Sequence, residues 1–142
     1  MLALDVFDQQ GVELAAALAE SYRVLRNDGA LVLRVSAHPM LYGAHDRAFH
    51  TGQRYTRRQV QTSLEQAGFA IQRLTYANAL LSPPVAAMRL AQRWGLLGWQ
   101  PTVYEQGGLH TIAAWSLRQE AAWLRRADLP WGLSLCAVAR KP

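Results

Sequence analysis

The chain has 142 residues, of which 51% are hydrophobic and 18% are charged, so it can form one folded domain and is too apolar to be disordered. The 15 Lys and Arg residues outnumber the 10 Asp and Glu residues, but they are dispersed in short pairs such as Arg57-Arg58. This dispersal argues against nucleic-acid binding, which requires basic residues gathered on one face.

The single cysteine, Cys136, cannot form an intrachain disulfide, which favours a reducing compartment and predicts a cytoplasmic protein. The first residues carry no basic segment typical of a signal peptide. The longest uncharged stretch lies between Arg73 and Arg89 and is interrupted by Pro83-Pro84, so we expect no transmembrane segment.

The first predicted element is a short buried strand over Leu2–Phe7. Apolar residues then recur at helical spacing and predict an amphipathic helix (Leu14, Leu18, Tyr22, Leu25). Gly29 is expected to take the left-handed conformation after this helix. Ala30–Val35 is almost continuously apolar, which is typical of a parallel strand covered by helices on both faces.

The segment 36–54 has no periodicity and holds three of the four histidines, and long loops of this kind often carry function. The next helix has the clearest start: Thr56 and Gln59 form a capping box, and Tyr55 and Val60 occupy the positions of a hydrophobic staple.

The remaining elements follow from spacing and from turn residues. The predicted order after Gly68 is a strand over Phe69–Thr75, a helix starting near Pro83-Pro84, an irregular Gly95–Gly108 segment, a helix around Trp115 and Trp123, and a last strand over Gly132–Ala139. This order predicts an α/β fold in a single domain, 1–142, with a helical insertion at 76–130 between the last two strands.

Five segments, in order, resemble the C-terminal half of class I S-adenosylmethionine-dependent methyltransferases of the small-molecule type. They are Leu2–Asp8 (fourth strand and acidic turn), Glu20–Gly29 (the following helix), Leu31–Leu33 (fifth strand), Tyr55–Phe69 (a helix ending in Ala-Gly-Phe before the sixth strand) and Trp131–Ala139 (antiparallel seventh strand). The resemblance implies a partial Rossmann-like sheet with flanking helices.

The same resemblance implies S-adenosylmethionine as cofactor, with Asp5, Phe7 and Asp8 as cofactor-binding residues at the carboxyl end of the first strand. For Asp5 the alternative is a carboxylate that only accepts hydrogen bonds from nearby backbone amides. The glycine-rich loop and ribose-binding acidic residue of such enzymes have no counterpart in this sequence, and we expect them to belong to an absent N-terminal half.

The loop sequence His45-Asp46 followed by Arg54-Tyr55 resembles a His-Asp…Gly-His-x-Arg-Arg-Tyr loop of a bacterial subgroup, although Thr51 stands where that loop has its histidine. The resemblance implies His45 and Asp46 as catalytic residues and Tyr42, Arg54 and Tyr55 as substrate-binding residues. The alternative is that they are ordinary surface-loop residues. No metal-ligand motif is present, so no metal is expected.

The sequence therefore predicts methyl transfer to a small-molecule or lipid-like acceptor. The first strand is apolar and unguarded by charge, so it should pair with a missing upstream portion or with another chain. This observation supports the alternative, a non-catalytic binding or dimerisation module that forms a homodimer through the N-terminal strand.

Overall fold

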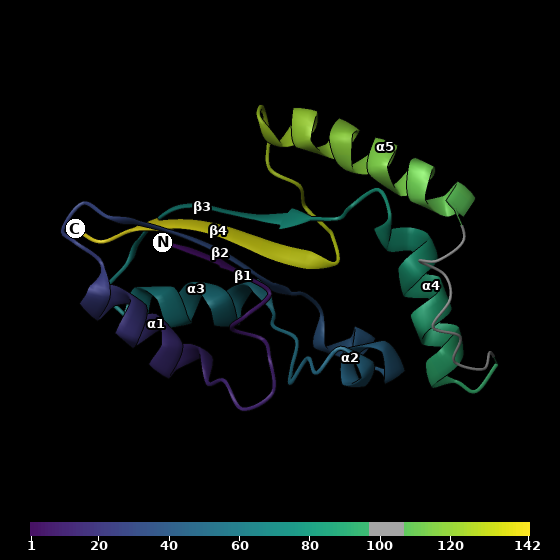
Figure 1. The fold of residues 1–142 in the computed structure, drawn as a ribbon, viewed down its shortest axis with the longest axis horizontal. Coiled ribbons are helices and arrows are strands. Elements are labelled where there is room, and N and C mark those ends of the chain that lie inside the picture. Colours follow the sequence, from purple (N-terminus) through teal and green to yellow (C-terminus); the bar gives the residue numbers. More distant parts are fainter. Residues whose placement is uncertain (97–106) are drawn as a thin grey trace.

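Four strands form one mixed sheet in the computed structural model, which describes residues 1–96 and 107–142 (Figure 1). The strands are β1 (Leu2–Leu4), β2 (Ala30–Ser36), β3 (Ala70–Ala77) and β4 (Ser134–Arg140), and their order across the sheet is β1-β2-β4-β3. The predicted α/β fold class is confirmed.

The direction of the strands places three carboxyl ends at one edge of the sheet. β1 pairs in parallel with β2, whereas β4 is antiparallel to both β2 and β3, as expected for the last strand. The carboxyl ends of β1, β2 and β3 therefore lie beside the amino end of β4. We call this edge the carboxyl edge.

Two helices, α1 (Leu14–Val24) and α3 (Arg57–Gln66), pack beneath one face of the sheet (Figure 1). Alternate residues of β2 and β4 point toward these helices and form the core with apolar residues of both helices (Leu18, Leu31, Leu33, Val35, Val60, Leu64, Leu135, Ala139). This face buries the apolar residues that the sequence spacing predicted.

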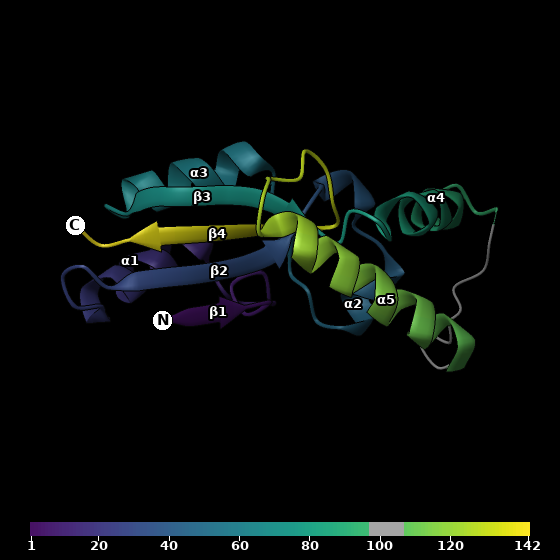
Figure 2. The same ribbon diagram turned by 90° about the horizontal axis from the view of Figure 1, so that it is seen from above.

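The opposite face of β1 and β2 carries no helix among the described residues, which corrects the expectation of strands covered on both faces. Leu2 and Leu4 are 66% and 43% exposed there. The helix α5 (Gly107–Leu124) lies mostly beyond the carboxyl edge in both views (Figures 1 and 2).

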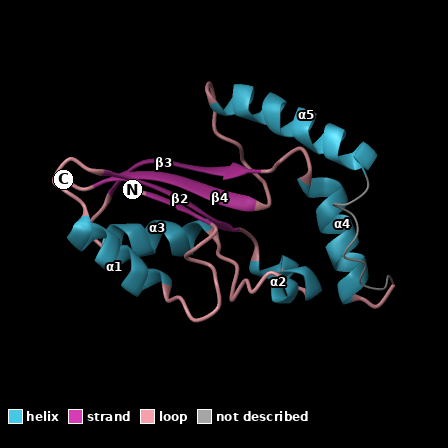
Figure 3. Ribbon diagram, viewed as in Figure 1, coloured by secondary structure: helices cyan, strands magenta, loops and turns pink. Residues whose placement is uncertain are grey.

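The remaining helical segments gather beyond the carboxyl edge (Figure 3). They are the 3-10 turn η1 (Pro39–Leu41), α2 (Ala44–Ala48) and α4 (Ser82–Arg93). Of the segment predicted to be irregular, Gly107 and Gly108 instead begin α5, and residues 97–106 lie outside the described residues.

Two boundaries differ from the prediction because of residues with positive φ. The first strand ends at Leu4 rather than at Phe7, because Asp5 has φ 53° and turns the chain. After α1, Asp28 takes the left-handed conformation at φ 63° in place of Gly29. Gly29 is required for space instead, since a Cβ there would lie 2.7 Å from the Arg26 carbonyl oxygen.

The capping box at the start of α3 is confirmed. The Gln59 amide N–H donates to Thr56 Oγ1 at 3.3 Å, and the Thr56 amide N–H donates to Gln59 Oε1 at 2.8 Å. Tyr55 and Val60, the predicted staple pair, are both buried in the core. After the helix, Gly68 has φ +93°, a conformation that glycine adopts without strain.

Replacing Thr56 by alanine should lower the free energy of unfolding by about 1 kcal/mol, because the Gln59 backbone N–H loses the Thr56 hydroxyl as its acceptor. Urea denaturation measures the change. Thr62→Ala, on the exposed face of the same helix, is the matched control and should be close to neutral. Equal effects of the two substitutions would show that the cap does not stabilise the helix.

Candidate functional site

The carboxyl edge collects the segments that follow β1 and β2, and open α/β sheets bind their ligands at such edges. The Asp5–Asp8 turn follows β1, Ser36 and His38 stand at the end of β2, and Asn78 follows β3. Ser134, at the start of β4, accepts a hydrogen bond from the Asn78 side chain at 3.1 Å. Ends of all four strands therefore contribute polar groups here.

Asp8 is the most enclosed of the predicted cofactor-binding residues, with 1% of its surface exposed. Its Oδ2 accepts the Ser36 amide N–H at 2.8 Å, and its backbone oxygen accepts the Gly52 N–H at 2.7 Å. Its Oδ1 is buried and has no hydrogen-bond partner. A buried acceptor without a donor costs free energy, so this oxygen is the unusual feature of the turn.

The other two residues of this turn differ in environment. Phe7 is buried in the core. Asp5 is partly exposed on the open face of the sheet and pairs with Arg34, whose Nε donates to Asp5 Oδ1 at 3.0 Å and whose Nη2 contacts Oδ2. Both Asp5 oxygens are thus engaged by a side chain, rather than by backbone amides as the alternative proposed.

Asp46 lies at the centre of a buried ion-pair cluster with Arg54 and Arg89. Arg54 donates to Asp46 Oδ1 from Nε at 2.9 Å and from Nη2 at 2.7 Å, and the Arg54 and Asp46 side chains are 4% and 2% exposed. Asp46 Oδ2 accepts from the Gly43 amide at 2.8 Å and from Arg89 Nη1 at 3.2 Å. Arg54 Nη1 also donates to the Ala37 carbonyl oxygen at 2.8 Å, which ties the loop to the end of β2.

Burial alone would raise the pKa of the Asp46 carboxyl, but the hydrogen bonds and positive charge of Arg54, with the Gly43 amide and Arg89, outweigh it and lower that pKa. The carboxylate is therefore charged at neutral pH and fully occupied by donors. This geometry favours a positioning role for Asp46 in the loop, and its predicted catalytic role stays a prediction.

The rest of the loop is fixed by weaker contacts. The His45 ring lies 4.5 Å from the Phe49 ring, and burial followed by the positive charge of Arg89 lowers the His45 pKa, so the imidazole is neutral at pH 7. The Tyr42 hydroxyl donates to the Thr51 carbonyl oxygen at 3.1 Å. The predicted roles of His45 and Tyr42 in catalysis and binding stay predictions.

Tyr55 links the two predicted groups of residues. Its hydroxyl donates to the Phe7 carbonyl oxygen at 3.4 Å and accepts from Gln53 Nε2, and burial raises its pKa. Its backbone oxygen accepts the His38 amide N–H at 3.1 Å. The structure therefore brings the loop residues beside the turn after β1.

Sequence reasoning missed two residues of this region, Arg89 and His38. Arg89 lies 43 residues after Asp46, on a helix predicted only from apolar spacing, so no sequence signal links the two. His38 was noted only as one of the loop histidines, yet its Nε2 is the second buried side-chain atom without a partner among the described residues.

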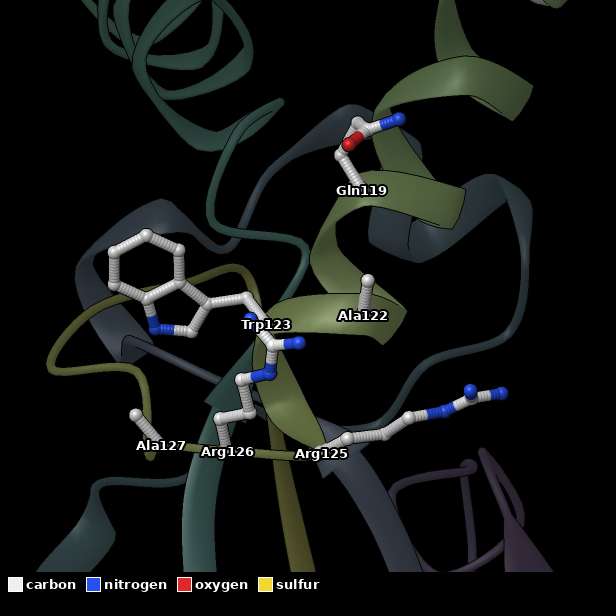
Figure 4. Close-up of a pocket in the computed structure, with 6 residues that line it drawn as sticks. All are labelled: Gln119, Ala122, Trp123, Arg125, Arg126 and Ala127. Atoms are coloured by element: carbon white, nitrogen blue, oxygen red, sulfur yellow. The ribbon is translucent and has the colours of Figure 1, made fainter.

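A separate surface pocket lies at the C-terminal end of α5 (Figure 4). Its lining combines the Trp123 ring with Arg125 and Arg126 and smaller side chains (Gln119, Ala122, Ala127). None of the predicted site residues lines it, so this pocket is distinct from the carboxyl-edge cluster.

The described residues hold no group of three or more His, Cys, Asp or Glu side chains that could bind a metal ion. In the same parts of the chain, no helix is both long and apolar enough to cross a membrane. The four described tryptophans, Trp94, Trp115, Trp123 and Trp131, are all exposed rather than packed in the core.

No protein-family model matches the sequence, and no curated protein matches it. Solved structures do match the fold. The chain is 16% identical to a geranyl diphosphate methyltransferase solved with GPP and sinefungin, at a TM-score of 0.54, covering 99% of this chain and 45% of that one. A Galdieria sulphuraria protein, provisionally assigned as a sarcosine dimethylglycine methyltransferase, is 12% identical at a TM-score of 0.52, covering 99% of this chain and 51% of that one.

The cyclase SpnF is also similar, with 20% identity, a TM-score of 0.51, and coverage of 99% of this chain and 48% of that one. The chain thus spans about half the length of the solved structures it matches. At these identities the likeness concerns the fold: the described chain has the fold of about half of a methyltransferase-like domain.

Replacing Asp46 by asparagine should lower the free energy of unfolding by about 3–5 kcal/mol, because it removes the carboxylate that pairs with the buried Arg54 guanidinium. Urea denaturation at pH 7 measures it. The control is Asp5→Asn, which removes a partly exposed pair and should cost at most about 1 kcal/mol. A small and equal loss in both variants would contradict a structural role for the cluster.

The Asp46→Asn penalty should also depend on pH in a defined direction. Because the folded-state pKa of Asp46 is lowered, its stabilisation is present above the unfolded-state pKa of about 4 and is lost as the pH falls through the folded value. The difference in unfolding free energy between wild type and Asp46→Asn should therefore shrink on acidification below about pH 4. A difference that stayed constant down to pH 2 would mean that Asp46 is not the titrating group.

Proposed function

We propose that this chain forms the acceptor-side half of an S-adenosylmethionine-dependent methyltransferase that acts on a small-molecule or lipid-like acceptor in the cytoplasm. The observation that carries the proposal is the buried Asp8 carboxylate, whose Oδ1 has no partner at the carboxyl end of β1. The fold likeness to methyltransferase structures supports it.

The residues after β1 fit the proposed cofactor in one specific respect. S-adenosylmethionine carries ammonium, ribose hydroxyl and adenine amino donors, and Asp8 Oδ1 is an acceptor that lacks a donor. In this proposal Asp8, with Asp5 and Phe7, holds the near side of the cofactor, and a glycine-rich loop outside this sequence holds its far side. When bound, the cofactor supplies a methyl group activated by a positively charged sulfur.

The loop residues would hold the acceptor. Arg54 and Asp46 fix the loop against the end of β2, and Tyr42, His45 and Tyr55 lie on or beside the segment they fix. Methyl transfer depends mainly on alignment of the nucleophile with the methyl group, so a rigid loop is a catalytic contribution in itself. In the proposed single domain, the insertion at 76–130 would cover this end of the sheet.

The proposal predicts that the chain alone binds S-adenosylmethionine weakly, with a Kd on the order of 1 mM or weaker, because only one side of the binding site is present. Amide shifts on titration should be confined to residues 5–8 and the end of β2, and Asp8→Asn should abolish them. Asp28→Asn, at the opposite end of the sheet, is the matched control.

Micromolar binding measured by calorimetry would contradict the half-site. Shifts that persist in Asp8→Asn, or that lie away from the carboxyl edge, would contradict the proposed cofactor position.

A second candidate function, a dimerisation module, is favoured by the outer edge of β1. The Val32 N–H donates to the Met1 carbonyl oxygen, and the Asp5 N–H donates to the Arg34 carbonyl oxygen. Because backbone groups alternate along a strand, those of Leu2 and Leu4 point away from β2. An apolar edge with unpaired backbone groups is a template for a strand of a second copy of the chain.

Light scattering across a concentration series tests this candidate. The wild type should form a homodimer or aggregate, and Leu2→Lys should shift it toward monomer, since an edge lysine opposes strand pairing. Leu117→Lys, on exposed α5, is the control and should leave the association unchanged. A monomeric wild type at high concentration would rule out self-association through β1.

A further inference from the structure

His38, at the end of β2, has a strained backbone. Its φ of 61° and ψ of 92° lie outside the regions that residues other than glycine normally adopt. Such conformations cost about 1–3 kcal/mol and persist where the surrounding structure enforces them, most often at functional sites. The strained backbone therefore makes His38 a candidate functional residue.

The His38 ring is held in a fixed orientation by aromatic contacts. It stacks on the Trp131 ring at a centroid distance of 3.7 Å and an interplanar angle of 23°, and lies parallel to the Tyr76 ring at 5.3 Å. The Gly132 backbone raises the His38 pKa, against the larger opposing effect of burial. Nε2 is the buried ring atom without a hydrogen-bond partner, and it accepts a hydrogen bond when the neutral ring carries its proton on Nδ1.

Gly132 is itself fixed, which makes this orientation rigid. A Cβ at Gly132 would clash with the Ala77 carbonyl oxygen, so this backbone packs directly on the end of β3. Nε2 is thus a preorganised acceptor whose lone pair is not used within the described residues. Burial, followed by the positive charge of Arg54, lowers the His38 pKa, which keeps that lone pair free at neutral pH.

We propose that His38 Nε2 accepts a hydrogen bond from a hydroxyl or amine group of a small ligand that binds against Trp131 at the carboxyl edge. Nε2 is buried and the Trp131 ring, which is 44% exposed, stacks on the His38 ring, so in this proposal the Trp131 side chain shifts to admit the ligand and provides an apolar surface beside the acceptor. One imidazole alone does not make a metal site, and the described residues supply no cluster to complete one. The His38 binding site is independent of the proposed function. Only the further step, in which this ligand is the methyl acceptor and carries an oxygen or nitrogen nucleophile, rests on the proposed function.

Phenol and anisole provide a matched pair of probes, because they share a ring and differ in the hydroxyl donor. Phenol titrated into the 15N-labelled protein should shift the His38 Nε2 resonance in the direction of hydrogen bonding, and anisole should not. Phenol should bind about tenfold more tightly than anisole, since one buried hydrogen bond accounts for a factor of this size.

His38→Asn removes Nε2 while keeping a residue type that tolerates the left-handed region. Phenol affinity should fall about tenfold in this variant and anisole affinity should not change. His50→Asn is the control, because His50 also has positive φ (57°) and is exposed. The wild-type Nε2 shift is a readout that does not depend on the stability of any variant.

Equal His38 shifts with phenol and anisole, or unchanged phenol affinity in His38→Asn, would overturn the proposal. These outcomes are separate from the cofactor test, which reads residues 5–8 and depends on Asp8. Micromolar S-adenosylmethionine binding, or S-adenosylmethionine shifts away from residues 5–8, together with a preserved phenol response would contradict the proposed half-site and leave the His38 site standing.

Discussion

The Asp46 carboxylate is the group on which the arrangement of the carboxyl edge depends. It accepts hydrogen bonds from Arg54 and Arg89 and so connects the loop both to the end of β2 and to α4, which lies 43 residues farther along the chain. The positive charges of Arg54 and Arg89 both act on the histidines near this cluster. Burial is the main cause that lowers the pKa of His38 and of His45, and the positive charge of Arg54 at His38 and of Arg89 at His45 lowers it further.

A second constraint is the asymmetry of the sheet. One face is sealed by α1 and α3 (Figure 1), whereas the other presents a row that runs from Leu2 through Val32 to Val138 in register. The Asp5–Arg34 pair stands on this open face and places charge beside apolar residues. The open face meets the carboxyl edge at Asp5, so whatever covers the face would also approach the turn that contains Asp8.

Local signals in the sequence were sufficient for most of the fold. The apolar periodicity of α1, the continuous apolar run of β2 and the Thr56 capping box each depend on residues close in sequence, and the structure confirms all three. The end of the first strand was not predictable, because apolar periodicity does not show that Asp5 takes a positive φ. Coverage of the sheet also depends on contacts between distant segments, which periodicity does not encode.

The candidate site likewise contains some residues that the sequence predicted and others that only the structure reveals. The loop sequence placed Asp46 and Arg54 together, but no spacing rule could reveal that Arg89 would complete their cluster or that Asp8 and His38 would each retain an unused acceptor. These two acceptors share a neighbour, since Tyr55 binds the His38 amide N–H through its backbone and the Phe7 carbonyl oxygen through its hydroxyl. Two acceptors cannot satisfy each other without a proton between them. The ligands proposed for this edge therefore bring donors, which is the polarity of amino and hydroxyl groups and opposite to that of phosphate or carboxylate.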